Sequence, residues 1–311
     1  MTNMKDVKTI PYRDREFFLQ GNSTCAGCGL DLSLRWALKA LGPKTVIVTP
    51  ASCLNVVTGN WPKGSPDFPF INMVFAGGAS AATGVYHGLK ARGIEDYTVM
   101  AYAGDGGTTD IGIQALSGAA ERDTNIIYVC YDNEAYMNTG IQRSSSTPVG
   151  TITTTTPFGK QEQKKNLPGI MAAHNIPYIA TASVGDPLDL YDKFKKAKDI
   201  TGLKYIHIYA PCPPGWRIDS EKSVEVAKMA IDNGMWILYE IENGFFRLTG
   251  KSKRLTDPNK RKPIQEYLKM QGRFRLVKEE QIKKLEQYRK LMWNQVTKEL
   301  LFQQLDEKSG S

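Results

Sequence analysis

Short runs of β-branched and apolar residues alternate along this chain with longer segments of helical periodicity. The runs lie at 45–49, 71–75, 98–102, 125–131, 178–181 and 205–209. Apolar residues at helical spacing fill intervals such as 33–41, 79–91, 111–122, 188–200 and 223–233. This alternation predicts an α/β fold, a twisted parallel sheet with helices on both faces.

The sequence changes character beyond about Leu248, where it becomes charged and is punctuated by prolines. We expect an α/β domain over 1–248 and a basic, largely helical extension over 249–311, ending in a helix from Glu279 to about Leu305. Residues 251–311 hold 16 Lys and Arg against 8 Asp and Glu, which accounts for the net charge of +8. Charge confined to one terminal segment favours an arm on an acidic partner subunit, or a solvated helix, over a nucleic-acid surface.

No run approaches the roughly 18 apolar residues that a membrane helix needs. The start of the chain, Met1 to Arg15, mixes charges and has no apolar stretch typical of a secretion signal. We therefore expect a cytoplasmic protein with no membrane or nucleic-acid partner. In that compartment the five cysteines indicate metal binding or catalysis rather than a disulfide framework.

A glycine-rich loop follows the predicted strand at 98–102. It reads Gly104-Asp105-Gly106-Gly107 and precedes a predicted helix. Glycines let the backbone approach phosphate oxygens, and a helix N-terminus supplies free N–H groups. Asp105 suits a magnesium ion that bridges phosphates. The Gly-Asp-Gly triplet alone is equally compatible with a tight turn.

A second polar loop, 132–140, follows the strand at 125–131. One helix and one strand separate it from Asp105, so both loops can emerge side by side at the carboxyl edge of a parallel sheet. The Asn133 side chain and the Ala135 carbonyl could then supply further oxygen ligands to magnesium. The Ser/Thr/Pro-rich segment 143–159 is a linker by composition, or a loop over the active site by position.

The cysteines fall into two groups. Cys25 and Cys28 form a CxxC turn, which is compatible with zinc, a redox dithiol or an iron-sulfur cluster. Cys53 and Cys212 each follow a predicted strand, and in a parallel sheet both would lie at the edge that carries Gly104. Cys130 lies inside a predicted strand and is expected to be a small buried hydrophobe. The histidines at 87, 174 and 207 have no partner motif and are expected to be structural or exposed.

The paired loops at 104–107 and 132–140 resemble the diphosphate-binding motif of thiamine-diphosphate enzymes. The string Asp-Asn-Glu-Ala-Tyr-Met-Asn-Thr-Gly-Ile-Gln-Arg at 132–143 resembles the beta subunits of pyruvate:ferredoxin oxidoreductases in particular. This resemblance runs from Cys25 to about Leu248 and continues more weakly through 264–274.

The resemblance implies thiamine diphosphate, Mg²⁺ and a 4Fe-4S cluster as cofactors. The cluster would be bound by Cys25, Cys28, Cys53 and Cys212, and Mg²⁺ by Asp105, Asn133 and Ala135. Asn138 resembles the family's polar residue beside the reacting substrate. The implied cofactor contacts are Gly104, Asp105, Gly106, Gly107, Asn133, Ala135, Tyr136, Met137, Asn138 and Thr139.

The implied reaction is oxidative decarboxylation of a small 2-oxo acid, with pyruvate as the first expectation. Electrons would pass one at a time through the cluster toward ferredoxin. An alpha subunit would complete the thiamine diphosphate site, and gamma- and delta-type subunits would carry further clusters. Use of coenzyme A stays open.

Three departures from the family pattern bear on the substrate. Asn55 follows Cys53-Leu54 where relatives often carry Glu, Ala76-Gly77 stands where they often read Glu-Asn, and Leu30 replaces an acidic residue of some relatives. Fewer carboxylates favour a more negative substrate, which makes oxalate the alternative. A non-redox thiamine-diphosphate lyase or synthase would share 104–107 but would not need four thiolates. A zinc-stabilised binding module would explain only the CxxC turn.

Overall fold

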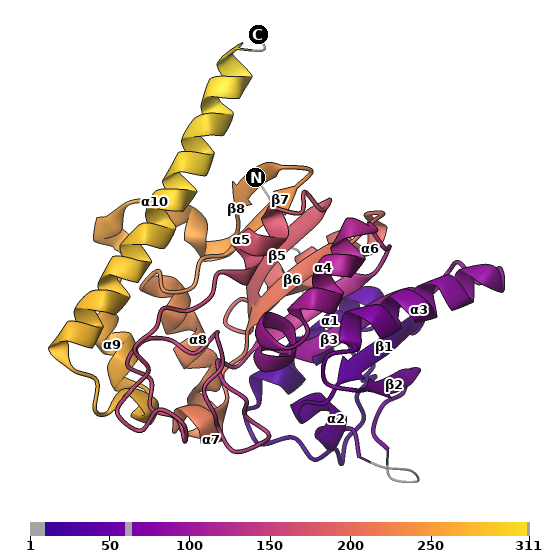
Figure 1. Cartoon of the computed structure of the whole chain (residues 1–311), viewed down its shortest axis with the longest axis horizontal. Coiled ribbons are helices and arrows are strands. Elements are labelled where there is room, and N and C mark those ends of the chain that lie inside the picture. The colour runs from indigo at the N-terminus through magenta and orange to yellow at the C-terminus, as the bar shows by residue number, and fades with distance from the viewer. Residues whose placement is uncertain (1–9, 60–63, 310–311) are drawn as a thin grey trace.

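An eight-stranded sheet forms the centre of the computed structural model, which describes residues 10–59 and 64–309 (Figure 1). The strand order is β2-β1-β3-β4-β6-β5-β7-β8. The six predicted strands are present and pair in parallel. The expectation about the start of the chain falls largely on residues 1–9, outside the described residues. The strands are β1 (Thr45–Pro50), β2 (Phe70–Met73), β3 (Thr98–Gly104), β4 (Ile127–Asp132), β5 (Tyr178–Ser183), β6 (Lys204–Tyr209), β7 (Tyr239–Glu242) and β8 (Phe245–Leu248).

One edge of the sheet differs from the predicted parallel arrangement. β7 pairs antiparallel with β5, and β8 folds back antiparallel on β7. The turn between β7 and β8 is Asn243-Gly244, with φ of 48° and 84°, and Asn-Gly is a preferred pair for a two-residue hairpin turn. The sheet is therefore mixed, and mostly parallel.

Helices cover both faces of the sheet, as predicted. α1 (Gly29–Leu41) and α6 (Pro187–Asp199) pack on one face, and α3 (Gly78–Ala91), α4 (Ile113–Glu121) and α5 (Leu167–Ala172) pack on the other. Successive strand residues point to opposite faces. Ile47 accordingly belongs to the first core and Val48 to the second.

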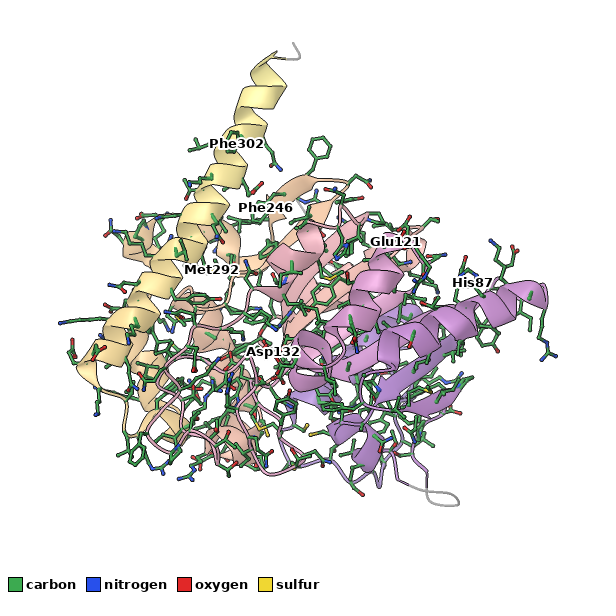
Figure 2. The ribbon with its side chains drawn as sticks, viewed as in Figure 1. His87, Glu121, Asp132, Phe246, Met292 and Phe302 are labelled. Atoms are coloured by element: carbon green, nitrogen blue, oxygen red, sulfur yellow. The ribbon has the colours of Figure 1, made fainter. Side chains whose placement is uncertain are left out.

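A third core joins the last strands to the C-terminal segment. It contains residues of α8 (Ser223–Asp232), β7, β8, α9 (Ile264–Lys269) and α10 (Glu279–Ser309). α10 confirms the predicted C-terminal helix. The first half of this helix packs on the body through the buried side chains of Leu285, Trp293 and Val296. In its second half, Leu301 and Phe302 are 54% and 64% exposed. The far end of the helix projects from the body (Figures 1 and 2).

None of the helices in the described ranges is long and apolar enough to span a bilayer.

The remaining α-helices of the described ranges are two short ones, α2 (Cys53–Val57) and α7 (Pro213–Trp216). α2 begins at Cys53, and α7 begins directly after Cys212.

The strand order creates a switch point between β1 and β3. From β1 the chain moves outward to β2, then crosses back to place β3 on the other side of β1. In open α/β sheets the loops diverge at such a point and leave a crevice outside the carboxyl ends of the strands. Here those ends are Pro50 and Gly104.

Candidate active site

A cleft opens at this switch point. The loops after β1, β3 and β4, which are distant in the sequence, meet around it. Its walls therefore combine the glycine-rich loop, the second polar loop and one cysteine. The lining residues are Ala51, Ser52, Cys53, Phe75, Gly104, Asp105, Gly106, Gly107, Tyr131, Asn133, Ala135, Tyr136, Met137, Asn138 and Thr139.

Three polar groups converge in the wall of the cleft. One end of the Asn133 amide lies 2.9 Å from Asp105 Oδ1 and 2.9 Å from the Ala135 carbonyl oxygen. With its nitrogen at that end, the amide donates to both acceptors. With its oxygen there, three oxygens face one another, an environment that suits a hard cation such as Mg²⁺. Burial, followed by the charge of Asp132, raises the pKa of Asp105, and a bound cation would favour its ionised form.

Gly106 allows the two polar loops to pack closely. A Cβ at this position would lie 2.3 Å from Cε1 of Tyr136. The Tyr136 hydroxyl donates to Asp110 Oδ2 at 2.8 Å, at the end of a π-helical turn over Gly106–Asp110. Any side chain at 106 would push the loops apart. The turn precedes α4, which confirms the helix predicted over 111–122.

The segment after the second loop packs against the two polar loops of the site. Ser144 donates to Asp105 Oδ2 at 2.5 Å, and Thr147 donates to the Glu134 carbonyl at 2.6 Å. The Lys160 ammonium donates to the Thr147 carbonyl at 2.7 Å, and burial lowers the pKa of Lys160 to about 8. The segment 143–159 is therefore tied to the site rather than being a loose linker, but none of its residues is among those that line the cleft.

Buried charges extend behind the second loop. Lys164 Nζ lies 2.6 Å from Asp132 Oδ2 and 2.7 Å from Glu134 Oε1. His207 joins Asp132 Oδ2 at 2.8 Å and the Tyr205 hydroxyl at 2.6 Å. Burial alone would raise the pKa of Asp132, yet Lys164 and His207 outweigh it and lower the pKa. His207 is therefore structural, as expected, but it supports a residue next to the cleft.

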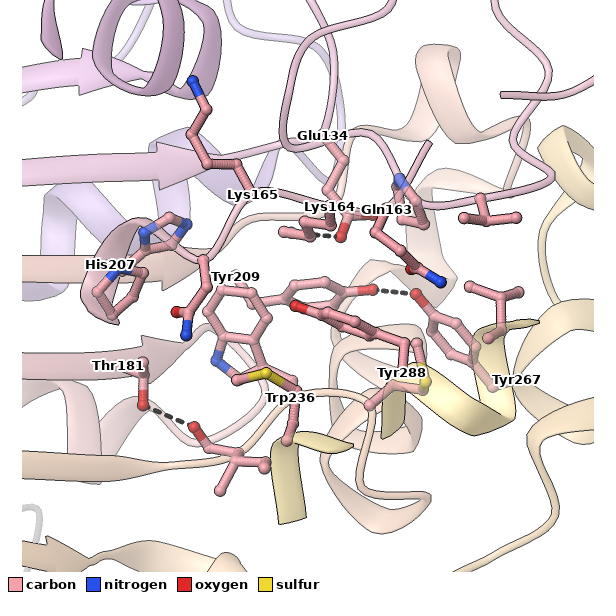
Figure 3. Close-up of a pocket in the computed structure, with 18 of the residues that line it drawn as sticks. Glu134, Gln163, Lys164, Lys165, Thr181, His207, Tyr209, Trp236, Tyr267 and Tyr288 are labelled. Atoms are coloured by element: carbon pink, nitrogen blue, oxygen red, sulfur yellow. Dashed lines mark hydrogen bonds and ion pairs between the residues drawn. The ribbon is translucent and has the colours of Figure 1, made fainter. Parts of the chain in front are cut away.

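A second cavity lies between this charged group and α10 (Figure 3). Its walls are largely aromatic, and the Lys164 ammonium lies 5.1 Å from the Trp236 ring centroid. Because the second loop and the C-terminal segment both line this cavity, the C-terminal segment lies directly behind the second loop. Its lining includes Glu134, Lys164, His207, Tyr209, Trp236, Tyr267 and Tyr288.

The cysteine loops also meet at this end of the sheet. The Gly29 amide donates to the Pro211 carbonyl at 3.0 Å, which joins the loop carrying Cys28 to the loop carrying Cys212. Cys53 lines the cleft itself. A Cβ at Gly215 would lie 2.3 Å from Met137 Sδ, so the Cys212 loop packs directly on the second polar loop.

The charges of the thiols affect one another's pKa values. Burial raises the pKa of Cys53 to about 12, with smaller contributions from Cys212, Cys28, Asp105 and Cys25. Burial likewise raises the pKa of Cys212 to about 12, with contributions from Cys28 and Cys25. Within 10–59 and 64–309, no three His, Cys, Asp or Glu side chains are arranged to hold one metal ion.

Comparison with known proteins identifies the family. The family described as "Thiamine pyrophosphate enzyme, C-terminal TPP binding domain" matches residues 59–208. Pyruvate synthase subunit PorB of Methanothermobacter marburgensis is 51% identical over 280 residues, covering 88% of this chain and 95% of that protein. Ketoisovalerate oxidoreductase subunit VorB of Pyrococcus horikoshii is 44% identical over 306 residues, covering 95% and 96%. The chain belongs to the PorB/VorB family of 2-oxoacid:ferredoxin oxidoreductase subunits.

A solved structure supports the fold of this PorB/VorB-family chain. The 2-oxoglutarate:ferredoxin oxidoreductase of Magnetococcus marinus aligns with a TM-score of 0.56 and 23% identity, over 71% of this chain and 81% of that chain. The family assignment establishes an oxidoreductase subunit with a domain of the thiamine-diphosphate-binding type.

The PorB/VorB-family chain has every predicted cofactor-contact residue in one cleft. Asp105, Asn133 and Ala135 are buried, whereas Asn138 and Thr139 are exposed at the mouth. The catalytic role of Asn138 stays a prediction. Cys130 is fully buried in β4, as its position inside a strand suggested.

Sequence reasoning missed the residues that support the cleft from behind. Ser144 lies in a segment crowded with Ser and Thr, so nothing marked it out. Lys164, Trp216 and Arg273 carry no motif, and only tertiary structure brings them to the second loop.

Proposed function

We propose that this chain binds thiamine diphosphate and Mg²⁺ in the cleft, within an enzyme that oxidatively decarboxylates pyruvate. Electrons would leave one at a time through a 4Fe-4S cluster toward ferredoxin. The observation that carries this proposal is that Cys53 lines the same cleft as Asp105. The name of the 51% identical relative, pyruvate synthase, favours pyruvate over other 2-oxo acids.

The residues of the cleft fit a magnesium diphosphate. Asp105, the Asn133 side chain and the Ala135 carbonyl would hold the cation, since the Asn133 amide lies 2.9 Å from both of the other oxygens and can turn its own oxygen toward a cation. Ser144 fixes the second carboxylate oxygen of Asp105 by donating to it. Thiamine diphosphate, when bound, supplies the carbon chemistry of decarboxylation. Asn138, which is exposed at the mouth, would contact the substrate.

The four thiols proposed as ligands would fit a polynuclear cluster. Cys25, Cys28, Cys53 and Cys212 interact electrostatically without converging on a single-ion position among the described residues. The thiolates that bind a 4Fe-4S cluster are separated by its iron and sulfide atoms, so they need not converge on one point as the ligands of a single ion do. Cluster binding would also ionise the thiols of Cys28, Cys53 and Cys212, whose pKa values burial raises.

Partner subunits complete the enzyme in this proposal. An alpha subunit would close the open mouth of the cleft near Asn138 and Thr139, and gamma- and delta-type subunits would relay electrons to ferredoxin. The basic extension over 249–311 would lie on an acidic surface of a partner subunit. The exposed Leu301 and Phe302 on the projecting end of α10 support this contact.

The test is a substrate screen on the native complex, purified without oxygen. We expect viologen or ferredoxin reduction with pyruvate, dependent on thiamine diphosphate and Mg²⁺. Activity with oxalate and none with pyruvate would favour the alternative suggested by Leu30, Asn55 and Ala76. Carbon dioxide release without reduction of an acceptor would instead indicate a non-redox lyase and would overturn the proposal.

A further inference from the structure

A single buried guanidinium contacts both loops that the proposed function uses. Arg273 belongs to the C-terminal segment and is 1% exposed. Its Nη2 donates to Glu134 Oε2 at 2.6 Å. Its Cζ lies 3.7 Å from the centroid of the Trp216 ring. Glu134 lies in the second polar loop, and Trp216 ends the short helix that follows Cys212.

The contact with Glu134 bears on the expected magnesium ligands. Glu134 lies between Asn133 and Ala135 and has a φ of 66°, a left-handed conformation that costs free energy in a residue other than glycine. Both carboxylate oxygens are engaged, one by Lys164 at 2.7 Å and the other by Arg273 at 2.6 Å. These ion pairs hold the backbone turn that directs the Asn133 side chain and the Ala135 carbonyl toward Asp105.

The contact with Trp216 bears on the cysteine loop. The fully buried Trp216 indole donates from Nε1 to the Asn133 carbonyl at 2.7 Å. Its backbone amide donates to the Cys212 carbonyl at 2.8 Å. The Arg273 guanidinium packs on this indole, so it supports the Cys212 loop on one side and the loop of Asn133 on the other.

A stabilising role alone explains Arg273 poorly. Burying an ion pair costs desolvation energy that its attraction often fails to recover, and Arg273 Nη1 has no hydrogen-bond partner among the described atoms. An apolar side chain could pack on Trp216 without that cost. The charge is therefore better explained by what it orients, namely Glu134.

We propose that Arg273 is a positioning residue that holds the magnesium loop and the Cys212 loop in register with each other. The inference rests on the proposed function, because it concerns the cofactors assigned there. Replacement of Arg273 is predicted to weaken magnesium-dependent cofactor binding. It is also predicted to slow electron transfer from substrate to the cluster.

The test compares Arg273→Lys with Arg261→Lys in the complete complex. Arg261 is a matched control, because its guanidinium lies 3.9 Å from the centroid of the Trp293 ring in the same C-terminal segment, away from the cleft. Lysine keeps the charge at both positions but loses the planar stack and the fork of donors. We expect Arg273→Lys to raise the Mg²⁺ concentration for half-maximal activity about 10-fold or more, as supporting residues behind metal ligands do. Arg261→Lys should stay within about two-fold.

Two further measurements separate positioning from stability. Glu134→Gln keeps the side-chain shape, and combining it with Arg273→Lys should give a smaller loss than the product of the single effects, because both act through one contact. The rate at which the substrate reduces the cluster can be monitored by electron paramagnetic resonance in a single turnover. This rate should be lower in Arg273→Lys at saturating Mg²⁺. Equal Mg²⁺ dependence and equal reduction rates in the two lysine variants would overturn the inference. A wild-type complex that needs neither thiamine diphosphate nor Mg²⁺ would instead refute the proposed function.

Discussion

Asn133 and Asp105 come from loops after neighbouring strands, and the Asn133 amide lies 2.9 Å from Asp105 Oδ1. The parallel register of β3 and β4 pairs Gly104 with Tyr131, so the chain leaves both strands at the same level of the sheet. The two side chains meet because of that register. The Ala135 carbonyl then joins them, since Glu134 turns the chain back through its left-handed conformation.

Ser144→Ala should weaken magnesium binding. The Ser144 hydroxyl donates to Asp105 Oδ2, and loss of a group that orients a metal ligand typically costs about 10–100-fold in affinity. Titration of activity with Mg²⁺ in the assembled enzyme measures the effect. Ser117→Ala is the control, because the Ser117 hydroxyl lies on α4 and, among the described residues, has His174 as its side-chain hydrogen-bond partner. Identical Mg²⁺ titrations for the two variants would contradict the role given to Ser144.

Lys204→Met should stabilise the isolated subunit at neutral pH. The Lys204 side chain is 3% exposed, and burial lowers its pKa to about 8 from 10.5, although Asp123 partly opposes the shift. Below pH 8 the folded protein therefore bears the full cost of a buried charge. We expect a gain of about 1–3 kcal/mol in the free energy of unfolding at pH 7.

The same variant gives a pH dependence of defined sign. Between pH 8 and 10.5 unfolding takes up a proton at Lys204, so wild-type stability rises relative to Lys204→Met as pH increases. The difference should close near pH 10.5. Denaturant unfolding of both proteins at several pH values measures it, and a difference that stays constant across this window would count against the shifted pKa.

Leu285→Ala should separate α10 from the body of the subunit. Leu285 is 1% exposed in the third core, and removal of a buried leucine side chain costs about 2–5 kcal/mol. Thermal or denaturant unfolding measures the loss. A cost below about 0.5 kcal/mol would mean that this half of α10 contributes little to the fold.

Leu301→Ala combined with Phe302→Ala should leave the stability of the subunit unchanged but weaken its assembly with partner subunits. Both side chains are more than half exposed, so unfolding of the isolated subunit should change by less than about 0.5 kcal/mol. Co-purification with the partner subunits should weaken, because these residues are proposed to lie in that contact. Unchanged assembly would remove the partner role proposed for the end of α10.

The sequence predicted the elements whose signal is local. A few consecutive residues are enough to predict a buried strand such as Tyr205 to Tyr209 or the glycine-rich loop Gly104–Gly107. Both were placed correctly. The β7–β8 hairpin was missed although Asn243-Gly244 is a turn signal, because its strands are short and half-exposed.

The support for the cleft had no local signal at all. Nothing near Arg273 in the sequence connects it to Glu134, and their ion pair depends on how α9 and the following turn pack beneath Trp216. His207 was predicted to be structural, but its bond to Asp132 depends on the pairing of β4 with β6. Sequence patterns thus predicted the cleft's inner wall, and tertiary packing determined what holds it in place.

The most direct test of the central claim is iron analysis of the complete enzyme carrying Cys212→Ser, compared with Cys130→Ser. Cys130 is buried in β4 and has no proposed role, so its variant should keep the wild-type iron content and the paramagnetic signal that appears on adding pyruvate. Cys212→Ser, with Cys53→Ser as a second variant, should lose about four iron atoms per copy of this chain, together with that signal. Full iron content in both Cys212→Ser and Cys53→Ser would contradict a cluster beside the cleft.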